Sequence, residues 1–563
     1  MFSWLVYLVR LCFISAGNLL KKGMPSPDYV FYTLQGHPAD LKAAPQSFLE
    51  KRMRPRDRSL QEIETDFRRI AAAPGVKGII LHPVNFTLSF SQAQSLMDMI
   101  KKLREAGKEV FTWAAAYDTA AFCLAAAGEK ILLQEGGAVY SLGFASRQLF
   151  MKNALQWCGI ELDAVRVGPY KTALDRYTHA RMSEEARRMT EWLLDSHYKQ
   201  LVEAIARGRK MTTEEVGALI EKTPLCGEKA VNAGAVDKII NAEDLPGYLG
   251  GSKPVRLVAW EECSRTFSRP LPLKPGKFIA LLRVEGSIVE GYSSRPPSRP
   301  PLPLPFLFNE RTGHLTFVRQ ARQIRKNRRI KAVLLYINSG GGSAAASEAI
   351  WAALDKVAAQ KPVVALMGSV AGSGGYYVAT PALYIVARPS TITGSIGVIM
   401  AKVVDSRLLN RLLLKRETVF RGEKDLFAST DEPFTDEERK KARALIDDIY
   451  TLFIRRVSDS RSLTAEEVEN IGGGRVWTGE QALGHGLVDK LGGLETALSH
   501  LRDLAKLPAG TPLVEMPLPG RETAPPPVAS SWLNYALEGL SLPGNGRALL
   551  VDPLFFFRPP DRE

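Results

Sequence analysis

Short apolar runs alternate with longer segments of helical periodicity along most of the chain. In the second half, four of these runs have the length of buried strands, at 278–284, 332–337, 362–367 and 384–387. Stretches in which apolar residues recur at helical spacing lie between such runs. Strands that alternate with helices in this way indicate an α/β domain with a parallel sheet.

The clearest predicted helix covers residues 435–457. Thr435 and Glu438 have the spacing of a capping box at its start. The residues that recur on one face are all apolar, namely Ala442, Leu445, Ile446, Ile449, Phe453 and Val457. A matching helix in the first half begins near Ser183 and carries Trp192, Leu193, Leu201 and Val202. We interpret both apolar stripes as packing surfaces.

The chain contains an internal repeat. Residues 76–81 resemble 330–335, and residues 131–133 resemble 385–387, with an offset of 254. Three further segments recur with an offset of 252, at 210–216 and 462–468, 227–228 and 479–480, and 236–238 and 488–490. A period of about 250 residues is too long for a solenoid and indicates a duplicated domain. We predict a first repeat at 28–247, a linker at 248–276 and a second repeat at 277–504.

Three segments lie outside the repeated pattern. Residues 293–308 are rich in proline, so we expect an extended loop within the second repeat, with a ligand for a proline-binding domain as the alternative. The tail at 505–563 is also rich in proline. Four apolar residues near its end, at 554–557, can contact lipid, a partner subunit or the chain's own domain. The third segment is residues 1–22.

Residues 1–22 are mostly apolar and long enough to span a bilayer as a helix. Arg10 lies at the centre, where insertion into a membrane costs about 2.5–3.5 kcal/mol. Ser3, Arg10, Gly17 and Lys21 share one narrow stripe, so the helix can instead lie in the membrane interface. We predict a membrane anchor of one of these two kinds. A cleaved signal peptide, which the central arginine disfavours, and a buried helix are the alternatives.

The composition gives the size and the net charge of the chain, and it argues against several kinds of binding site. The chain has 563 residues, 45% hydrophobic and 24% charged, which is enough for two or more domains. The net charge of +14 is spread out, without a zinc finger or a basic helix with interleaved aromatic residues. We therefore expect an anionic membrane surface rather than nucleic acid as a partner. The five cysteines form no C-x-x-C pair and the seven histidines no H-E-x-x-H motif, so we expect no metal and no cofactor.

Two glycine-rich turns follow predicted strands of the second repeat. In the first, at 338–343, Gly340, Gly342 and Ala345 have the spacing of a dinucleotide fingerprint, but the next strand does not end in the acidic residue which that motif requires. Consecutive glycines also let backbone N–H groups point at one ligand atom, as an oxyanion hole requires. We favour the second interpretation.

The second turn, at 371–376, places Ser373 between glycines at the end of a strand. Such a turn can expose the hydroxyl while the next amide helps to bind an oxyanion. Ala371 stands where the G-x-S-x-G elbow has glycine, so an α/β-hydrolase is not indicated. The alternative interpretation is a small residue in a tight turn.

A catalytic serine needs a base. No histidine lies near these turns in the sequence, and we interpret His485, between two glycines, as a turn residue. A lysine can serve where an apolar pocket lowers its pKa from about 10.4 towards neutrality. Lys171 has an apolar neighbourhood of this kind, at 167–174.

The stretches 338–348, 368–398 and 167–177 together resemble the signal peptide peptidase A family, also called protease IV, in its long duplicated form. The resemblance implies a tandem duplication of a ClpP/crotonase-like domain behind the N-terminal anchor helix. It also implies a Ser/Lys dyad in which Ser373 is the nucleophile and Lys171 the general base, while the Ser395 hydroxyl helps to hold the lysine. The backbone amides that would line the oxyanion site are those of Gly341, Gly342 and Gly374.

The chain departs from the family pattern at two places. Gly340 replaces a proline that usually stands in the first turn. Lys424 lies at the position of the second repeat that corresponds to Lys171, about fifty residues after Ser373, where single-repeat relatives carry their lysine. We prefer Lys171, because Glu423 and Asp425 flank Lys424 and carboxylates raise the pKa of a lysine.

In the first repeat, the position of Ser373 is taken by Thr119, beside Asp118 and without flanking glycines. We therefore expect a single nucleophile, in the second repeat.

Together these features predict a membrane-associated serine endopeptidase that acts through an acyl-enzyme. The resemblance implies apolar peptide substrates, such as remnants of signal peptides, and a homotetramer at a bacterial inner membrane. The family implies its outer face, whereas Lys21, Lys22, Lys51, Arg52 and Arg54 favour a cytoplasmic body if the N-terminal segment spans the membrane. The alternatives are a crotonase-type acyl-CoA enzyme, which needs no Ser/Lys pair, and a non-catalytic membrane scaffold.

Overall fold

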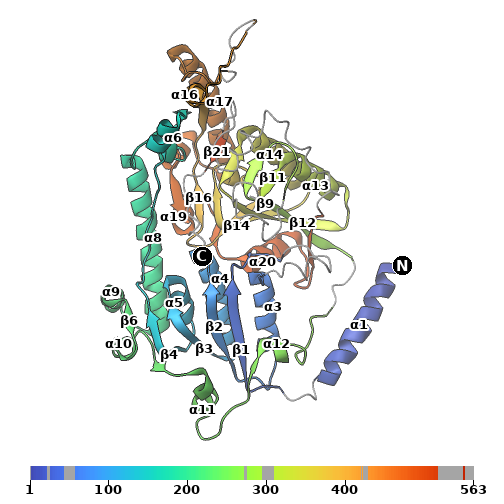
Figure 1. Cartoon of the computed structure of the whole chain (residues 1–563). Coiled ribbons are helices and arrows are strands. Elements are labelled where there is room, and N and C mark those ends of the chain that lie inside the picture. The colour runs from blue at the N-terminus through green and yellow to red at the C-terminus, as the bar shows by residue number, and fades with distance from the viewer. Residues whose placement is uncertain are drawn as a thin grey trace. The chain divides into compact units, whose positions relative to one another are not determined.

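The computed structural model describes residues 2–21, 26–42, 57–271, 276–294, 310–419, 421, 429–517 and 549–551 (Figure 1). The chain divides into two compact units. The first combines Met1–Ala145 with His197–Gly276, and the second combines Ser146–Ser196 with Lys277–Glu563. Lys171 therefore lies in the second unit, although its segment precedes the second repeat in the sequence.

The first unit contains one mostly parallel sheet. Its strands are β1 (Tyr29–Gly36), β2 (Gly78–Phe86), β3 (Glu109–Tyr117), β4 (Lys130–Val139), β6 (Leu225–Cys226), β7 (Lys238–Ile239) and β8 (Leu257–Ala259). The order is β6-β4-β3-β2-β1-β8, with β7 beside β4, and every described pair except β4 with β6 is parallel. Ile79, Ile80 and Leu81 of β2 are all fully buried, as expected for a parallel strand covered on both faces.

Helix α1 precedes the first strand of the first unit, and its other helices lie between or after the strands in the sequence. They are α1 (Phe2–Lys21), α3 (Leu60–Ala71), α4 (Phe90–Glu105), α5 (Thr119–Ala126), α9 (Thr213–Lys222), α10 (Glu228–Asn232), the 3₁₀ turn η1 (Ala242–Asp244), α11 (Leu245–Gly250) and α12 (Trp260–Cys263). The long helix α8 (Glu184–Arg209) belongs to the second unit up to Ser196. The predicted linker 248–276 includes β8 and α12, and β8 extends the sheet beside β1.

The second unit has a larger sheet with the same plan. Its strands are β9 (Phe278–Glu285), β12 (Ile330–Ser339), β14 (Val363–Gly372), β15 (Tyr384–Ala387), β16 (Ile392–Gly394), β18 (Val476–Thr478), β19 (Lys490–Leu491) and β20 (Leu513–Glu515). The order is β18-β16-β14-β12-β9-β20, and β15 pairs with β14 and β19. The four strands predicted in the second half are confirmed as β9, β12, β14 and β15.

A second sheet of this unit joins segments from distant parts of the chain. Its strands are β5 (Glu161–Arg166), β10 (Ser287–Val289), β11 (Arg311–Gly313), β13 (Gly341–Ser343), β17 (Ile399–Val404) and β21 (Leu549–Val551). They follow the order β11-β10-β13-β21-β17-β5. Because β5 pairs along its whole length with β17, the segment that follows β5, including Lys171, is held against the second repeat.

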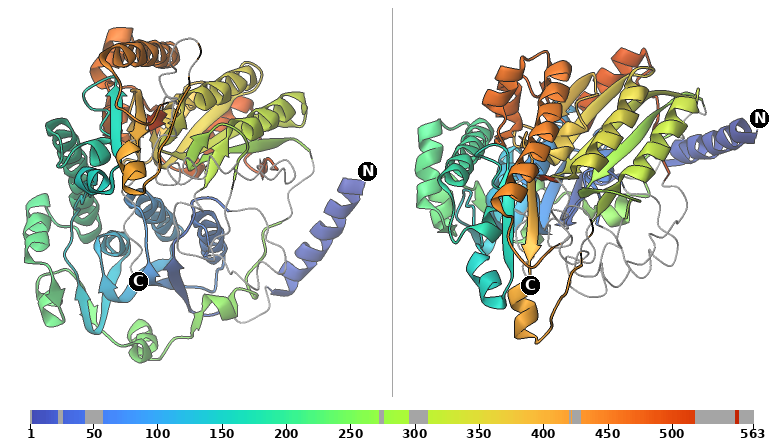
Figure 2. Two further views of the ribbon diagram at one scale, coloured as in Figure 1. Left: turned by 45° about the horizontal axis from the view of Figure 1, so that its top comes forward. Right: turned by 90° about the horizontal axis from the view of Figure 1, so that it is seen from above.

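Helices of the second unit pack on both of its sheets. Beside the first part of α8 they are α6 (Lys152–Cys158), α7 (Asp175–Thr178), α13 (His314–Lys326), α14 (Ala344–Ala358), α15 (Gly374–Tyr377), α16 (Ser406–Arg411), α17 (Asp436–Arg461), α18 (Ala465–Ile471), α19 (Gly479–Gly484) and α20 (Leu494–Ala505). Helices α13 and α14 lie side by side (Figure 2), and they share one apolar core with Val333, Leu335 and Ile337 of β12. The predicted helix at 435–457 is confirmed as α17, with the capping box of Thr435 and Glu438.

The duplication extends to individual hydrogen bonds. In the first unit, Asp237 accepts hydrogen bonds from Arg209 at 2.7 Å and from the backbone N–H of Ile131 at 2.7 Å. The equivalent trio in the second unit joins Asp489 to Arg461 at 2.9 Å and to the N–H of Ile385 at 2.7 Å. With the matching strand orders, these contacts support two copies of one α/β domain.

Helix α1 carries the predicted anchor sequence. Within the described part of the chain, no helix combines the length and the hydropathy of a membrane span. The C-terminal end of α1 is tied to the first unit, because Lys21 donates a hydrogen bond to the carbonyl of Phe267 at 2.9 Å, and Asn18 exchanges two hydrogen bonds with the backbone of Arg269.

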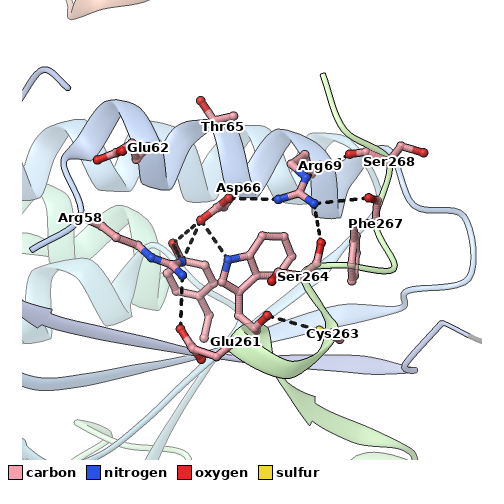
Figure 3. Close-up of polar contacts among 12 residues, drawn as sticks. Arg58, Glu62, Thr65, Asp66, Arg69, Glu261, Cys263, Ser264, Phe267 and Ser268 are labelled. Atoms are coloured by element: carbon pink, nitrogen blue, oxygen red, sulfur yellow. Dashed lines mark hydrogen bonds and ion pairs between the residues drawn. The ribbon is translucent and has the colours of Figure 1, made fainter. Parts of the chain in front are cut away.

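A partly buried carboxylate, that of Asp66, links α3 to α12 (Figure 3). Asp66 Oδ2 accepts hydrogen bonds from Tyr32 at 3.1 Å, Arg58 at 2.8 Å and the indole of Trp260 at 2.9 Å. Arg69 lies 3.5 Å from Asp66 and donates to backbone carbonyls at 264–268. Burial raises the pKa of Asp66 despite the two arginines. Most of these side chains donate their hydrogen bonds to Asp66. We therefore interpret the network as a structural link between α3 and α12.

Candidate active site

Ser373 lies at the sharp turn between β14 and α15. Its backbone has φ 53° and ψ −116°, in a region that residues other than glycine rarely adopt. The turn is held by a hydrogen bond from the Ser373 N–H to the carbonyl of Gly394 at 2.8 Å. Strained backbone of this kind recurs at functional sites, where the surrounding structure fixes it.

The amine of Lys171 meets the hydroxyl of Ser373. Lys171 Nζ lies 2.7 Å from Ser373 Oγ, and both residues are fully buried. The same amine donates hydrogen bonds to the carbonyl and to the hydroxyl of Ser395, each at 2.9 Å. The three residues singled out from the sequence thus come together within the second unit.

Ser395 also has a left-handed backbone, with φ 54°. Its N–H donates to the carbonyl of Arg475 at 2.7 Å, and β17 begins four residues later. Since β17 pairs with β5, one sheet positions both Ser395 and the lysine segment.

The three predicted oxyanion glycines are also close together. A Cβ atom added to Gly374 would lie 3.1 Å from Gly341 Cα and 3.3 Å from Gly342 N. Gly341 has φ 101° and Gly342 φ 156°, values that favour glycine. The N–H of Gly341 already donates to Ser339 Oγ at 3.1 Å, so the amides of Gly342 and Gly374 are better placed to meet a substrate oxygen.

The glycine run 472–474 packs directly against the lysine segment. A Cβ added to Gly474 would lie 2.3 Å from Lys171 N, and one added to Gly168 would lie 2.4 Å from Gly473 O. The N–H of Tyr170 donates to that carbonyl of Gly473 at 3.1 Å. Only residues without a side chain allow the two backbones to approach this closely.

Arg475 follows the glycine run, and the sequence analysis did not identify it. Its guanidinium lies 4.3 Å from the centre of the Tyr170 ring and donates to the carbonyl of Gly472 at 3.1 Å. Its own carbonyl accepts from Ser395. Arg475 therefore touches the supports of both Lys171 and Ser395. The run of three glycines directly before Arg475 is the feature of the sequence that could have identified it.

Asp175 helps to hold the segment that carries Lys171. It accepts hydrogen bonds from Arg166 at 2.8 Å and from Ser183 Oγ at 2.6 Å. These bonds join the end of β5 to the start of α8, across the segment that carries Lys171. Burial raises the pKa of Asp175, while Ser183 and Arg166 act in the opposite direction.

The first unit lacks these features at the equivalent positions. Asp118 has an ordinary φ of −85° and caps α5 by accepting from the N–H of Ala121 at 2.8 Å. Thr119, which corresponds to Ser373, exchanges hydrogen bonds with the backbone of Gly143 at 3.0 Å. Thr87 and Leu88 stand where the second repeat has Gly341 and Gly342.

Lys424, the alternative base, lies outside the described residues. Among the residues that are described, no group of three His, Cys, Asp or Glu side chains is arranged to hold a metal ion. The groups that the structure brings together at Ser373 are its buried hydroxyl, the Lys171 amine and the backbone of the neighbouring glycines.

Comparison with known proteins finds matches in both repeats. The model of Peptidase family S49 matches residues 102–249 and 355–508, one match in each repeat. Protease 4 of Salmonella typhi is 30% identical over 468 residues, which cover 80% of this chain and 73% of that protein. Protease 4 of Haemophilus influenzae is 26% identical over 535 residues, covering 89% and 83%. The chloroplastic serine protease SPPA of Arabidopsis thaliana is 28% identical over 541 residues, covering 94% and 76%. The chain therefore belongs to peptidase family S49, the serine peptidases of the signal peptide peptidase A and protease IV group, in the form with a duplicated domain.

Proposed function

We propose that this serine peptidase is a membrane-associated endopeptidase with a Ser/Lys dyad, in which Ser373 is the nucleophile and Lys171 the general base. The observation that carries the proposal is the 2.7 Å distance between Lys171 Nζ and Ser373 Oγ. A nucleophile and its base must lie within hydrogen-bonding distance for the proton to pass. The strained backbone of Ser373 supports the same assignment.

The reaction begins when uncharged Lys171 takes the proton of Ser373 Oγ. Burial disfavours the charged form of an amine, so a lysine in this environment can act as a base. Oγ then attacks the carbonyl carbon of the scissile peptide bond. The carbonyl and the hydroxyl of Ser395 accept hydrogen bonds from the lysine ammonium that results, and so hold it in place.

The tetrahedral intermediate carries a negative oxygen. We assign its binding to the backbone N–H groups of Gly342 and Gly374, with Gly341 holding the loop through Ser339. The Lys171 ammonium then donates its proton to the leaving amine, which departs and leaves an ester between the substrate carbonyl and Ser373 Oγ. A water molecule, deprotonated by Lys171, hydrolyses this acyl-enzyme and regenerates the serine.

The dyad is tested by cleavage of an apolar peptide that carries a fluorescent reporter. We expect Ser373→Ala and Lys171→Ala each to lower kcat/KM by roughly 10⁴-fold or more. Lys424→Ala should retain most of the activity, and Lys356→Ala, which changes an exposed lysine on α14, serves as the control. Loss of activity in Lys424→Ala with full activity in Lys171→Ala would overturn the assignment of the base.

Membrane association is supported by the surface of α1. Five of its apolar residues are exposed, between 47% for Val9 and 77% for Phe13, the others being Leu8, Leu19 and Leu20. An apolar helix face of this kind binds lipid by burial of its side chains. The full chain should float with lipid vesicles in a density gradient, whereas the double variant Phe13→Asp, Leu20→Asp should stay with the soluble fraction. Equal flotation of both proteins would contradict an anchoring role for α1.

The family resemblance extends the proposal to fold, substrate and assembly. We propose that both copies have the ClpP/crotonase-like fold, that the substrates are apolar peptides such as signal-peptide remnants, and that four chains assemble. Light scattering of the detergent-solubilised protein tests the assembly, since a monomer would contradict it. Cleavage of a polar peptide as fast as an apolar one would contradict the substrate class.

A further inference from the structure

Helix α13 has a strongly basic outer face. Its inner face packs into the core of the second unit through Phe317, Ala321 and Ile324, beside α14 and β9 (Figure 1). The outer side of the helix and the turn that follows it carry six exposed cations. We call these residues the α13 basic face: Arg319, Arg322, Arg325, Lys326, Arg328 and Arg329.

The cations of the helix lie close together. Arg319, Arg322 and Lys326 are spaced three and four residues apart, so they form one stripe along α13. Arg325 lies three residues after Arg322 and borders this stripe. Side chains at such spacing are neighbours, with about 5–6 Å between their Cβ atoms. The positive charges are therefore concentrated on about two turns of one helix face.

Carboxylates are absent from the surrounding sequence. The chain has no aspartate or glutamate between Glu310 and Glu348, so the segment that contains α13 does not neutralise its own charge. On the neighbouring helix α14, Asp355 lies 3.7 Å from Lys356 of the same helix.

The corresponding helix of the first copy shows that the fold does not require these charges. With the repeat offset of 254, residues 314–331 correspond to 60–77, which contain α3. Both helices bury an apolar face in the core of their unit. The segment 60–77 carries three cations and three carboxylates, whereas 314–331 carries seven cations and no carboxylate. The excess of positive charge is thus a property of the second copy alone.

Helix stability accounts for only part of this charge. Cations in the last turn, such as Arg325 and Lys326, interact favourably with the helix dipole. Arg319 and Arg322 lie earlier in the helix, and like charges three or four residues apart destabilise a helix. An anionic partner would remove this repulsion as well as adding attraction of its own.

We propose that the α13 basic face binds the anionic phospholipid headgroups of a bilayer, and so gives the second unit its own contact with a membrane. The inference goes beyond the proposed function, which assigns membrane contact to α1 of the first unit. Clusters of four to eight lysines and arginines on an amphipathic helix are typical of binding to anionic lipid. Leu315, which is 44% exposed and lies four residues before Arg319, adds an apolar contact at the level of the headgroups.

A bilayer fits this face better than a single-stranded nucleic acid does. Proteins that bind single strands combine cations with exposed aromatic side chains on which the bases stack. On α13 the exposed large apolar side chain is that of Leu315, and Phe317 is buried. The long aliphatic stems of arginine and lysine let their charged ends reach the headgroups while the helix stays packed on its unit.

The test is flotation of the full chain with vesicles of two compositions, phosphatidylcholine alone and phosphatidylcholine with about 30% phosphatidylglycerol. The background is the α1 variant Phe13→Asp, Leu20→Asp, which removes the apolar contact of α1. At about 0.05 M salt this variant should stay in the soluble fraction with the neutral vesicles and float with the anionic ones. Salt at about 0.5 M should release it, because salt screens exposed charges. Binding to anionic vesicles that does not weaken with salt would overturn the proposal.

The basic-face variant adds four substitutions to this background: Arg319→Gln, Arg322→Gln, Arg325→Gln and Lys326→Gln. Each cation near an anionic surface strengthens binding about fivefold, so the partition coefficient for anionic vesicles should fall roughly 10²-fold or more. Thermal unfolding of each protein verifies that it is folded.

A matched control removes the same number of exposed cations from α17 and β19: Lys440→Gln, Lys441→Gln, Arg455→Gln and Lys490→Gln. The control has the same net charge as the basic-face variant, but its α13 basic face is intact. Its partition coefficient should stay within about threefold of the background. Equal partition coefficients of the control and the basic-face variant would overturn the proposal. Binding to an RNA oligonucleotide or a poly-glutamate peptide, without binding to anionic vesicles, would also overturn it and would assign the face to that partner.

Failure of the proposed function gives a different result. If Ser373 is not the nucleophile, none of these proteins reacts there with a small serine-directed phosphonyl fluoride, and the vesicle measurements are unaffected. If α1 is not an anchor, the wild type and the α1 variant float equally with neutral vesicles. If only the inference about the α13 basic face is wrong, all of the proteins react at Ser373, and the basic-face variant and its control bind anionic vesicles equally.

Discussion

Lys171 Nζ and Ser373 Oγ lie 2.7 Å apart, although 202 residues separate them in the sequence. The two residues belong to different repeats but to one compact unit, because the segment Ser146–Ser196 packs with the second repeat. The pairing of β5 with β17 accounts for this placement, since it ends within a few residues of both Lys171 and Ser395. Under the proposed function, residues of both copies therefore contribute to one site, while in the first copy an ordinary helix cap, Asp118, stands beside Thr119, the equivalent of Ser373.

The first prediction concerns Ser395. Removal of its hydroxyl in Ser395→Ala takes one of three hydrogen bonds from the Lys171 amine, so we expect kcat to fall roughly 10- to 100-fold with little change in KM. Steady-state kinetics on an apolar peptide measure both constants. Ser91→Ala, which removes a buried hydroxyl of the first unit that is hydrogen-bonded to Ser89 Oγ, should retain kcat within about twofold. Equal kcat in the Ser395→Ala variant and the wild type would refute the role of this hydroxyl.

Arg475 is expected to position the base without touching the substrate. In Arg475→Ala the stacking on Tyr170 and the bond to Gly472 are lost, so Lys171 is held less firmly. We predict a roughly tenfold lower kcat, an almost unchanged KM and a shift in the pH at which kcat reaches half its maximum. Arg475→Lys should recover part of the loss because a cation remains over the ring.

Arg455→Ala, at an exposed position of α17, is the matched control and should behave as the wild type. A purely structural role for Arg475 would lower the melting temperature and leave the pH profile of the remaining activity in place.

The third prediction tests the oxyanion site. In Gly374→Ala the new methyl group would lie 2.7 Å from Ser347 Oγ, 3.1 Å from Gly341 Cα and 3.3 Å from Gly342 N, so the Ser347 side chain and the glycine loop must shift. Loss of an oxyanion donor lowers kcat by about 10²–10³-fold. Gly484→Ala, at the end of α19 where a Cβ meets no atom within 4 Å, should have normal kinetics. Normal kcat in Gly374→Ala would exclude this loop from stabilising the intermediate.

The fourth prediction concerns the stability of the first unit. Asp66→Ala leaves Arg58, Tyr32 and the Trp260 indole without their shared acceptor, so we expect a loss of about 3 kcal/mol in the free energy of unfolding. For a unit of this size that is roughly 6–12 °C in melting temperature. Glu105→Ala, which removes an exposed ion pair with Lys101, should shift it by less than about 2 °C.

The carboxylate of Asp66 also makes the free energy of unfolding depend on pH. Because burial raises the pKa of Asp66, the folded unit holds this proton more tightly than the unfolded chain. The contribution of the group to stability is therefore present at low pH and decreases as the pH rises above the ordinary range of an aspartate. The wild type should lose stability relative to Asp66→Asn as the pH rises above about 4. A relative gain over that range would show that the pKa of Asp66 is lowered.

Much of the fold follows from patterns that are local in the sequence. Apolar runs of strand length predict β9, β12, β14 and β15, because a strand buried on both faces leaves a continuous apolar signal. The capping box of Thr435 and Glu438 predicts where α17 begins. The repeat offset predicts two copies of one domain. In the structure, Asp237 and Asp489 make the same contacts in the two copies.

The candidate site can be predicted only in part from patterns that are local in the sequence. Ser373 and its glycines stand out because a tight turn needs small residues in consecutive positions. Lys171 could be proposed from its apolar neighbours and from the family resemblance, but its contact with Ser373 depends on a strand pairing that no periodicity encodes.

Arg475 and β21 could not be predicted, for different reasons. The role of Arg475 arises from packing on Tyr170, which is distant in sequence. β21 pairs through its backbone in a tail rich in proline and glycine, where nothing in the sequence indicates a partner.

The most direct test of the account measures how fast Ser373 reacts with a small phosphonyl fluoride as the pH is varied. Oγ attacks phosphorus, fluoride leaves and the proton passes to the base, so the rate reports the dyad without a peptide substrate. Peptide mapping should locate the adduct on Ser373, and its rate should rise with pH as Lys171 loses its proton. In Lys171→Ala the rate should fall by at least about 10²-fold. An adduct on another residue, or an unchanged rate and pH profile in Lys171→Ala, would contradict the central claim.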